Sequence, residues 1–291
     1  MITSAVLAAA AGEFQVMGIV NVTPDSFSDG GLYLDRTAAV EHGLALERAG
    51  ATLLDVGGES TRPGASPVPE DEELRRVIPV IEGLRTRGSA AQLSIDTSKA
   101  SVARAALTAG ATLVNDVTAL RGDPEMAGVI ADADADCCLM HMLGEPRTMQ
   151  RDPRYSDVVS EVKAFLEARL NVAVAAGVAE ERILLDPGIG FGKTTEHNLA
   201  LLRRLTEIVA LGRPVVIGTS RKSFLGKITA RPVEDRIAAT IATNVVAYER
   251  GARVFRVHDV GPVHDALAIT AATVGRPWEQ TTPTSSTMST T

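Results

Sequence analysis

The 291-residue sequence has little cysteine, no basic cluster and no long apolar run without charges. Its two cysteines, Cys137 and Cys138, are adjacent, and no other cysteine exists to pair with them. We therefore expect two buried, reduced residues and a reducing compartment, the cytoplasm. No stretch of about 18 or more apolar residues lacks charges, so we expect no membrane span. The apolar N-terminus has no basic region, which argues against a signal peptide and favours a flexible end over residues 1–13.

The charge balance indicates which kinds of partner the protein can bind. Thirty-six acidic residues exceed 29 basic ones and give a net charge of −7, with no basic cluster, which argues against a nucleic-acid partner. An anionic substrate would then need a local cationic pocket against an acidic background. The C-terminal segment, residues 276–291, is rich in serine and threonine and shows no apolar periodicity, so we expect it to be disordered.

From residue 14 to residue 275 the sequence alternates short aliphatic runs with longer helical patterns. The runs are almost continuously apolar, which is typical of a parallel sheet covered on both faces. Repeated joints such as Gly50-Ala51 and Gly110-Ala111 indicate that a helix ends at a glycine and a strand follows at once. The strands are expected at Gln15–Val20, Thr52–Val56, Gln92–Ile95, Thr112–Asn115, Cys138–His141, Arg182–Leu185, Pro214–Gly218 and Arg253–Val257.

Eight such units predict an α/β fold, a single-domain (β/α)8 TIM barrel, in preference to an open doubly wound sheet. One intervening helix is expected over Asp157–Ala176, with an apolar stripe that includes Leu166, Leu170 and Val174. In such barrels the functional site lies at the carboxyl ends of the strands, although the fold alone does not name a reaction.

Polar side chains stand where several of these runs end. Asp96, Asn115 and Asp186 end the third, fourth and sixth runs. Two carboxylates and an amide could form a metal site, an acid/base pair or a frame for a polar ring. A metal cage usually shows more carboxylates or a histidine cluster nearby. A 2-amino-4-oxo heterocycle fits better, because a carboxylate can accept two parallel N–H bonds from its edge.

Cationic residues follow the seventh and eighth runs. Lys222, in GTSRKSFLG, lies between a strand and a helix and, with Ser220 and Ser223, predicts a seat for an anion. Arg256 and His258 are two residues apart on the last strand, so their side chains should share a face. Both residue types suit phosphate, because arginine offers a bidentate fork and protonated histidine donates a hydrogen bond.

Asn21 ends the first run, and its amide oxygen could ligate Mg²⁺, a metal normally shared with substrate phosphates. Strands one and eight are neighbours in a closed barrel, so Asn21 should meet Arg256 and His258.

Two segments rich in Pro, Gly, Ser and Asp follow the first and second strands, at residues 23–31 and 57–66. They read as long, mobile βα loops of the kind that close over a reaction and exclude water. The contacts that they would offer are apolar at Phe27 and Pro63 and polar at Thr61 and Arg62.

Eight motifs, in order and with typical spacings, resemble those of dihydropteroate synthase, the pterin-condensing enzyme of folate synthesis. They are NVTPDSFSDGG, DVGGESTRPGA, SIDTSK, LVNDV, MHMLGEPRTMQ, LDPGIGFGKTTEHN, GTSRKSFLG and RVHDV. The resemblance covers residues 16–272. It implies a TIM barrel that joins 6-hydroxymethyl-7,8-dihydropterin diphosphate to p-aminobenzoate and releases diphosphate and 7,8-dihydropteroate. It further implies Mg²⁺ as cofactor and a homodimer.

The resemblance also implies a role for each matched position. The pterin ring would be held by Asp96, Asn115, Asp186 and Lys222, flanked by Met140 and Phe191, and approached by the backbone at Gly218. The diphosphate would be bound by Asn21, Thr61, Arg62, Arg256 and His258, with Asn21 also on the metal. The p-aminobenzoate side would be formed by Phe27, Thr61, Arg62, Pro63 and Ser223. The catalytic groups would be Asp96, Lys222, Arg256 and His258.

Loss of diphosphate from the pterin methylene leaves a cation conjugated to the ring, so an SN1-like step is expected, assisted by groups that neutralise the leaving group.

Two rival functions stay open. A methyltransferase that moves a methyl group from methyltetrahydrofolate to a corrinoid would use a similar ring frame, but it has no need for Arg62, Arg256 or His258. A non-catalytic pterin- or diphosphate-binding paralogue would carry the same motifs.

Overall fold

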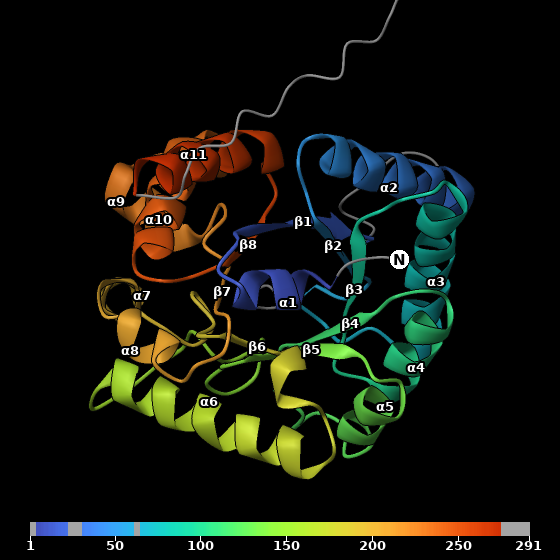
Figure 1. The fold of residues 1–291 in the computed structure, drawn as a ribbon, viewed down its shortest axis with the longest axis horizontal. Coiled ribbons are helices and arrows are strands. Elements are labelled where there is room, and N and C mark those ends of the chain that lie inside the picture. Colours follow the sequence, from blue (N-terminus) through green and yellow to red (C-terminus); the bar gives the residue numbers. More distant parts are fainter. Residues whose placement is uncertain (1–3, 23–30, 61–64, 275–291) are drawn as a thin grey trace, which may run out of the picture.

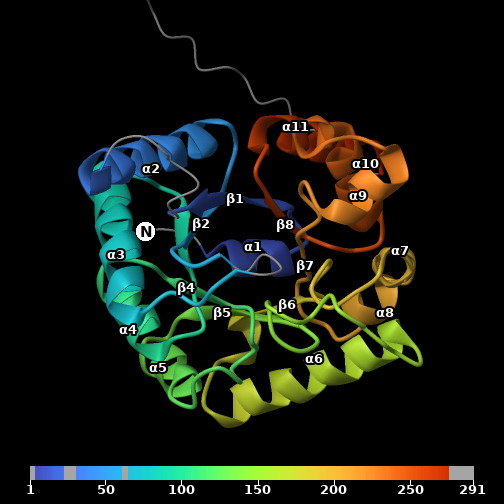
Figure 2. The same ribbon diagram turned by 180° about the vertical axis from the view of Figure 1, so that it is seen from behind.

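The computed structural model describes residues 4–22, 31–60 and 65–274. Figure 1 shows a ring of strands enclosed by helices, and Figure 2 shows the same ring from behind. The strands run parallel in the order β6-β5-β4-β3-β2-β1-β8-β7, and a bridge from Leu185 to Val215 joins the two ends of the sheet. The predicted single-domain (β/α)8 barrel is confirmed.

Every predicted strand is present, and each end lies within two residues of its predicted place. The nearly continuous apolar runs form strands because both of their faces are covered. The strands are β1 (Gln15–Asn21), β2 (Leu53–Gly57), β3 (Gln92–Asp96), β4 (Leu113–Asp116), β5 (Asp136–Met140), β6 (Ile183–Asp186), β7 (Val216–Ile217) and β8 (Val254–Val257).

Helices connect these strands on the outside of the ring. None of them, within the described residues, combines the length and the apolar character that a membrane crossing needs. The α-helices are α1 (Ala5–Ala10), α2 (Gly31–Arg48), α3 (Glu70–Thr86), α4 (Ala100–Thr108), α5 (Met126–Asp132), α6 (Val158–Ala175), α7 (Thr195–Arg203), α8 (Thr206–Val209), α9 (Ser223–Thr229), α10 (Ile237–Glu249) and α11 (Val260–Thr273), and the short 3₁₀ turns are η2 (Glu180–Arg182) and η3 (Val233–Asp235).

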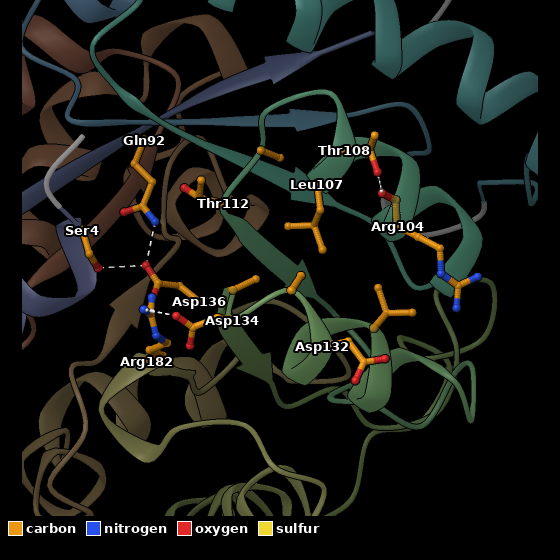
Figure 3. A pocket seen from close by; sticks show the side chains of 14 residues that line it. Ser4, Gln92, Arg104, Leu107, Thr108, Thr112, Asp132, Asp134, Asp136 and Arg182 are labelled. Atoms are coloured by element: carbon orange, nitrogen blue, oxygen red, sulfur yellow. Dashed lines mark hydrogen bonds and ion pairs between the residues drawn. The ribbon is translucent and has the colours of Figure 1, made fainter. Parts of the chain in front are cut away.

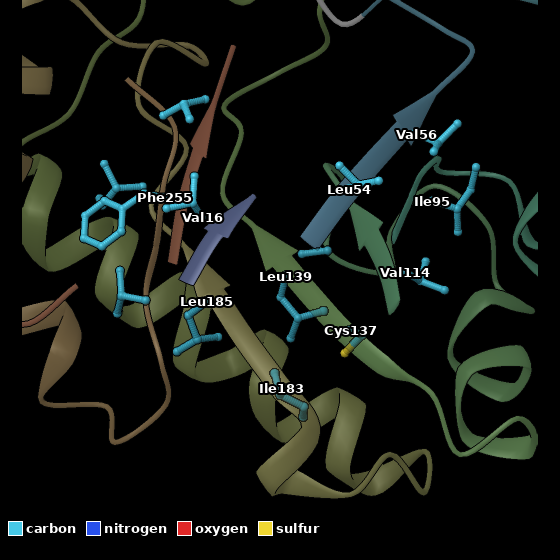
Figure 4. Packing of buried hydrophobic residues seen from close by; sticks show 14 of the residues in the cluster. Val16, Leu54, Val56, Ile95, Val114, Cys137, Leu139, Ile183, Leu185 and Phe255 are labelled. Carbon is cyan, nitrogen blue, oxygen red and sulfur yellow. The ribbon is translucent and has the colours of Figure 1, made fainter. Parts of the chain in front are cut away.

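Outward-facing strand residues form the main core with the surrounding helices. Figure 4 shows residues such as Val56 of β2, Ile95 of β3 and Phe255 of β8, all buried in one continuous cluster. Cys137 belongs to this outer layer, whereas its neighbour Cys138 lies in the separate inner cluster of the barrel. The expectation that both cysteines are buried and unpaired is confirmed.

Inward-facing residues change character along the barrel. One layer of them is apolar and forms the second cluster: Met17, Leu53, Leu113, Cys138, Leu184, Val216 and Val254, together with Ala5, Val6 and Ala9 of α1. Side chains two residues apart on a strand share a face. The next inward positions therefore include Asp55, Asn115, Asp186 and Arg256. The barrel interior therefore has an apolar layer against α1 and mainly polar side chains at the carboxyl ends of the strands.

Residues 1–13 were expected to form a flexible N-terminus, but the described part from Ser4 onward contains helix α1, which packs against this apolar layer. Figure 1 shows α1 lying across the ring of strands. The Ser4 side chain accepts from the Leu7 N–H and donates to Asp136, and the Ala5 N–H donates to Gln92. A short alanine-rich helix is marginal alone, and burial against the barrel stabilises it.

A groove of about 650 Å³ opens at this same end (Figure 3). Its polar residues bond to one another, because Asp136 accepts from Ser4, Gln92 and Arg182. This end of a TIM barrel serves stability, so the groove is not the candidate for chemistry.

Candidate active site

Four neighbouring strands bring their ends to one level at the opposite mouth of the barrel. Asn21 of β1 pairs in register with Gly57 of β2, Gly57 with Asp96 of β3, and Asp96 with Asn115 of β4. Parallel pairing with matched register therefore assembles three of the predicted site residues in one row.

Asp55 links this row to the last strand. Its carboxylate accepts from Ser94 Oγ at 2.6 Å, from Asn115 Nδ2 at 3.0 Å and from Arg256 Nε at 2.6 Å. Arg256 also donates from Nη2 to Asp96 Oδ2 at 2.8 Å. Asp55 is fully buried and was not predicted as a site residue. Its signal in the sequence is a carboxylate at an inward position of an apolar strand, two residues after Leu53.

The hydrogen bonds and burial around Arg256 shift the pKa values of Asp96 and Arg256. Burial raises the pKa of Asp96 from 3.8 to about 7, against the opposing effect of Arg256. Burial disfavours the charged guanidinium of Arg256, but Asp55 and Asp96 more than offset it and raise the pKa of that group. Arg256 thus stays a cation between two acidic residues, with 22% of its side chain exposed.

Asp186 ends β6 at the same mouth and is buried. Its Oδ1 accepts from the Gly188 N–H at 2.6 Å. Burial raises the pKa of this carboxyl, while the Gly188 N–H and the charge of Lys222 act in the lowering direction. Met140 of β5 pairs in register with Asp186.

An apolar wall stands beside Asp186. Met140 lies in a small buried cluster with Val117, Met142 and Met149, and Phe191 packs against that cluster. The two residues predicted to flank a ring therefore belong to one wall.

Lys222 lies over the ring of Phe191, with its Nζ 4.1 Å from the ring centroid, within the range of a cation–π contact. Ser223, the first residue of α9, follows Lys222 and is exposed. Gly218 directly follows β7, and an added Cβ would meet no atom within 4 Å. Space for a ligand therefore exists beside this backbone.

The ends of β7 and β8 are joined by hydrogen bonds. Ser220 Oγ lies 3.0 Å from His258 Nδ1 and accepts from the His258 N–H at 3.1 Å. The Arg221 guanidinium donates to both oxygens of Asp259, at 3.0 and 2.5 Å. The loop that carries Lys222 is thereby fixed to the strand end that carries His258.

The second βα segment is anchored where it leaves the barrel. Lys99, in the SIDTSK motif, donates to the carboxylates of Glu59 and Glu73. The Glu73 side chain is 1% exposed and that of Lys99 is 25% exposed, so this ion pair ties the segment to a buried carboxylate. The sequence reasoning missed these three residues. The predicted contacts Phe27, Thr61, Arg62 and Pro63 lie outside the described residues, as do residues 23–30 and 61–64 of the two predicted mobile loops.

A magnesium ion would find little protein ligation here. Within the described residues no group of three or more His, Cys, Asp or Glu side chains could hold a metal ion. Asn21 supplies an amide oxygen at the mouth. This residue fits an ion that takes most of its oxygen ligands from substrate phosphates and water, as Mg²⁺ commonly does.

Known proteins are similar to this chain in sequence. The family model described as pterin binding enzyme matches residues 17–258. A dihydropteroate synthase of Haemophilus influenzae is 44% identical over 259 residues, which cover 89% of this chain and 94% of that protein. A dihydropteroate synthase of Mycobacterium leprae is 48% identical over 266 residues, covering 89% and 93%.

Solved structures agree with these relatives. Xanthomonas albilineans dihydropteroate synthase with 4-aminobenzoic acid superposes with a TM-score of 0.86 at 50% identity, covering 91% of this chain and 94% of that one. The same enzyme in complex with 7,8-dihydropteroate gives 0.82 at 47% identity, covering 91% and 95%. Yersinia pestis dihydropteroate synthase with a sulfonamide drug complex gives 0.85 at 45% identity, covering 90% and 95%.

Proposed function

This chain belongs to the dihydropteroate synthase family of pterin-binding enzymes, and on that premise we propose that it is a transferase of folate biosynthesis. It condenses 6-hydroxymethyl-7,8-dihydropterin diphosphate with p-aminobenzoate to give 7,8-dihydropteroate and diphosphate. The single observation that carries the proposal is Arg256, bonded to both Asp55 and Asp96 at the mouth. This contact supports the proposal because a guanidinium that would bind phosphate lies beside Asp96, a carboxylate that would bind the ring.

The ring pocket follows from the polar row and the apolar wall. Asp96, Asn115 and Asp186 offer oxygen acceptors for the N–H groups of the pterin edge, as a 2-amino-4-oxo ring requires. Asp55 orients Asn115 and Arg256 and so acts through them. The wall of Met140 and Phe191 supports stacking against the flat ring, with Lys222 above Phe191.

Departure of diphosphate is the step in which charge develops most. Arg256 and His258 would bind the leaving diphosphate, and a pre-placed cation stabilises developing negative charge without reorganisation. Bound Mg²⁺, held by Asn21 and by the diphosphate itself, would supply further neutralisation of the leaving group. The ionised forms of Asp96 and Asp186 would favour the positive charge left on the ring. The step is therefore SN1-like.

The p-aminobenzoate nitrogen then attacks the methylene, and an arylamine needs little help from a general base. Ser223, exposed beside Lys222, is the described residue assigned to this substrate. Family membership assigns the rest of the p-aminobenzoate site to Phe27, Thr61, Arg62 and Pro63.

The direct test measures 7,8-dihydropteroate formed from the two substrates, with magnesium and with EDTA. We expect turnover in magnesium and its loss in EDTA. Tight pterin binding without turnover would favour the non-catalytic paralogue. Methyl transfer from methyltetrahydrofolate to a corrinoid, without pteroate formation, would favour the methyltransferase.

Substitutions should separate pterin binding, departure of diphosphate and binding of p-aminobenzoate. Asp96→Ala or Asp186→Ala should abolish pterin binding in calorimetry, and full retained affinity would refute the assignment. Arg256→Lys keeps the charge but loses the fork to Asp55 and Asp96, so it should lower turnover by about tenfold or more. Changes at Phe27 or Pro63 should chiefly raise the KM for p-aminobenzoate.

We also propose that two copies of the chain associate, as family membership implies. Ile269 on α11 is 70% exposed and Val274 just beyond it is 53% exposed, which supports a contact on this side of the barrel. Sedimentation equilibrium of the wild type and of Ile269→Glu tests this. A monomeric wild type would exclude the dimer, and a dimeric variant would exclude this face.

A further inference from the structure

Lys193 is a buried lysine beside the ring pocket. It lies in the loop after β6, in the GFGK part of its motif, and is 3% exposed. Its Nζ lies 2.9 Å from His141 Nδ1, 3.0 Å from the Phe191 carbonyl oxygen and 3.4 Å from the His141 carbonyl oxygen. An ammonium has three N–H donors, so three acceptors satisfy it. The sequence reasoning assigned this lysine no role.

These bonds join two loops that carry the pocket wall. His141 directly follows Met140 at the end of β5, whereas Phe191 lies in the loop after β6. Other contacts tie the same two segments together: Tyr155 Oη donates to the Gly192 carbonyl at 2.8 Å, and Gln150 Nε2 donates to the Gly190 carbonyl at 2.5 Å. Lys193 is the charged member of this set, and it holds the residue whose ring faces Lys222.

The electrostatic setting of Lys193 also points to the pocket. Burial lowers the pKa of Lys193 to about 7, while the charge of Asp186 raises it and that of Lys222 lowers it. Burial and the neighbouring Lys193 lower the pKa of His141 to about 3, so this imidazole is neutral and can accept at Nδ1. In return, Lys193 acts on Asp186 in the direction that favours its carboxylate form.

We propose that Lys193 is a positioning residue for the ring pocket: its ammonium fixes Phe191 and the segment after Met140, and its charge supports ionised Asp186. The inference deepens the proposed function and rests on it, since it concerns the same pterin site. A purely structural role would be served as well by an apolar side chain, because burying a cation is costly and a well-packed apolar replacement is often neutral or stabilising.

The test replaces Lys193 by methionine, which keeps an unbranched apolar stem and removes the charge with all three donors. Lys227→Met, on the exposed face of α9, is the matched control. Pterin affinity is measured by calorimetry, KM is measured for both substrates, and stability is measured by urea unfolding. We expect Lys193→Met to weaken pterin binding by about tenfold or more, the scale of a lost charge-assisted hydrogen bond. The KM for p-aminobenzoate should change by less than about twofold, and Lys227→Met should match the wild type.

Lys193→Gln keeps two N–H donors without the charge and covers the case in which the methionine variant does not fold. It should weaken pterin binding by a smaller factor, about threefold or more. Wild-type pterin affinity in a folded Lys193 variant would overturn the inference, as would a parallel rise of both KM values with lowered stability. If Asp186→Ala loses the pterin while the Lys193 variants keep it, the inference fails and the proposed function stands. If none of these variants affects pterin binding, the proposed function fails.

Discussion

Asp96 illustrates how a single side chain can favour binding at the expense of stability. Its pKa is raised from 3.8 to about 7 by burial, although Arg256 opposes the shift. Between these values the folded state holds a proton that the unfolded chain has released. Asp96 therefore stabilises the ligand-free protein at low pH, and this contribution is lost as the pH rises through about 7.

Asp96→Asn should remove this dependence, because an amide stays neutral at every pH. We expect the free energy of unfolding of the variant, relative to the wild type, to rise by roughly 1 kcal/mol or more from pH 5 to pH 8, since one pKa unit corresponds to about 1.4 kcal/mol. Urea unfolding at both pH values measures this. Asp132→Asn, at an exposed position, is the control and should follow the wild type. Equal pH profiles for wild type and Asp96→Asn would contradict the assignment.

Prediction from sequence differed between residues of the same site. Asp96, Asn115 and Asp186 could be predicted, because each ends an apolar run and breaks its pattern. Asp55 and Lys193 were missed, because the partners that give them a role, Arg256 and His141, lie far from them along the chain. Arg256, which bonds to Asp55, follows it by 201 residues.

At the scale of elements, α1 shows what a short helix contributes when a barrel end supports it. Val6 is fully buried in the inner cluster, whereas the adjacent Leu7 is 48% exposed. Val6→Ala should lower the free energy of unfolding by about 1–2 kcal/mol through lost burial and a cavity. Leu7→Ala, on the same helix, should change it by less than about 0.5 kcal/mol. Urea unfolding measures the free energy of unfolding of both variants. Equally small losses in the two would mean that packing of α1 against the barrel contributes little to stability.

The loop after β6 requires glycine at position 188. Gly188 has a φ of +66°, and an added Cβ would overlap the His141 carbonyl oxygen. Gly188→Ala should therefore destabilise the protein by more than about 3 kcal/mol, through strain and overpacking beside Asp186. Gly212 has a φ of +80° but open space around it, so Gly212→Ala should cost only about 1–2 kcal/mol. Thermal or urea unfolding measures the loss of stability in both variants. Similar losses would show that the protein relieves the overlap between the added Cβ and the His141 carbonyl.

Helix α6 shows the limit of reading an element from its own pattern. The predicted helix over Asp157–Ala176 is confirmed as Val158–Ala175, with the Asp157 side chain accepting from the Val159 N–H at its start. Leu166 and Leu170 of the predicted stripe are buried, but Val174 is 40% exposed. Near its end the helix buries Ala173 instead, because the neighbouring elements decide which face is covered.

For the molecule as a whole, the barrel is not joined equally all round. β1 pairs with β2 over five residue pairs and with β8 over four, whereas β6 meets the segment before β7 through the single bridge from Leu185 to Val215. Local opening follows the weakest hydrogen-bonded contacts. We expect amide hydrogen exchange to be faster at Val216 and Ile217 than in β1 to β3, as mass spectrometry of peptides can measure. Uniform protection around the ring would contradict this.

The sequence by itself determined the eight units, the polarity of their strand ends and the family, because these depend on local periodicity and on motifs. Tertiary structure decided which side chains meet. Register placed Asn21, Asp96 and Asn115 in one row, and closure brought Arg256 from the last strand to Asp55 on the second. Tertiary structure also packed α1 against the inner cluster of the barrel and placed Lys193 where it bonds to the Phe191 carbonyl. The physical reason is that hydrogen bonds and burial between distant segments depend on distances in space, which no local pattern encodes.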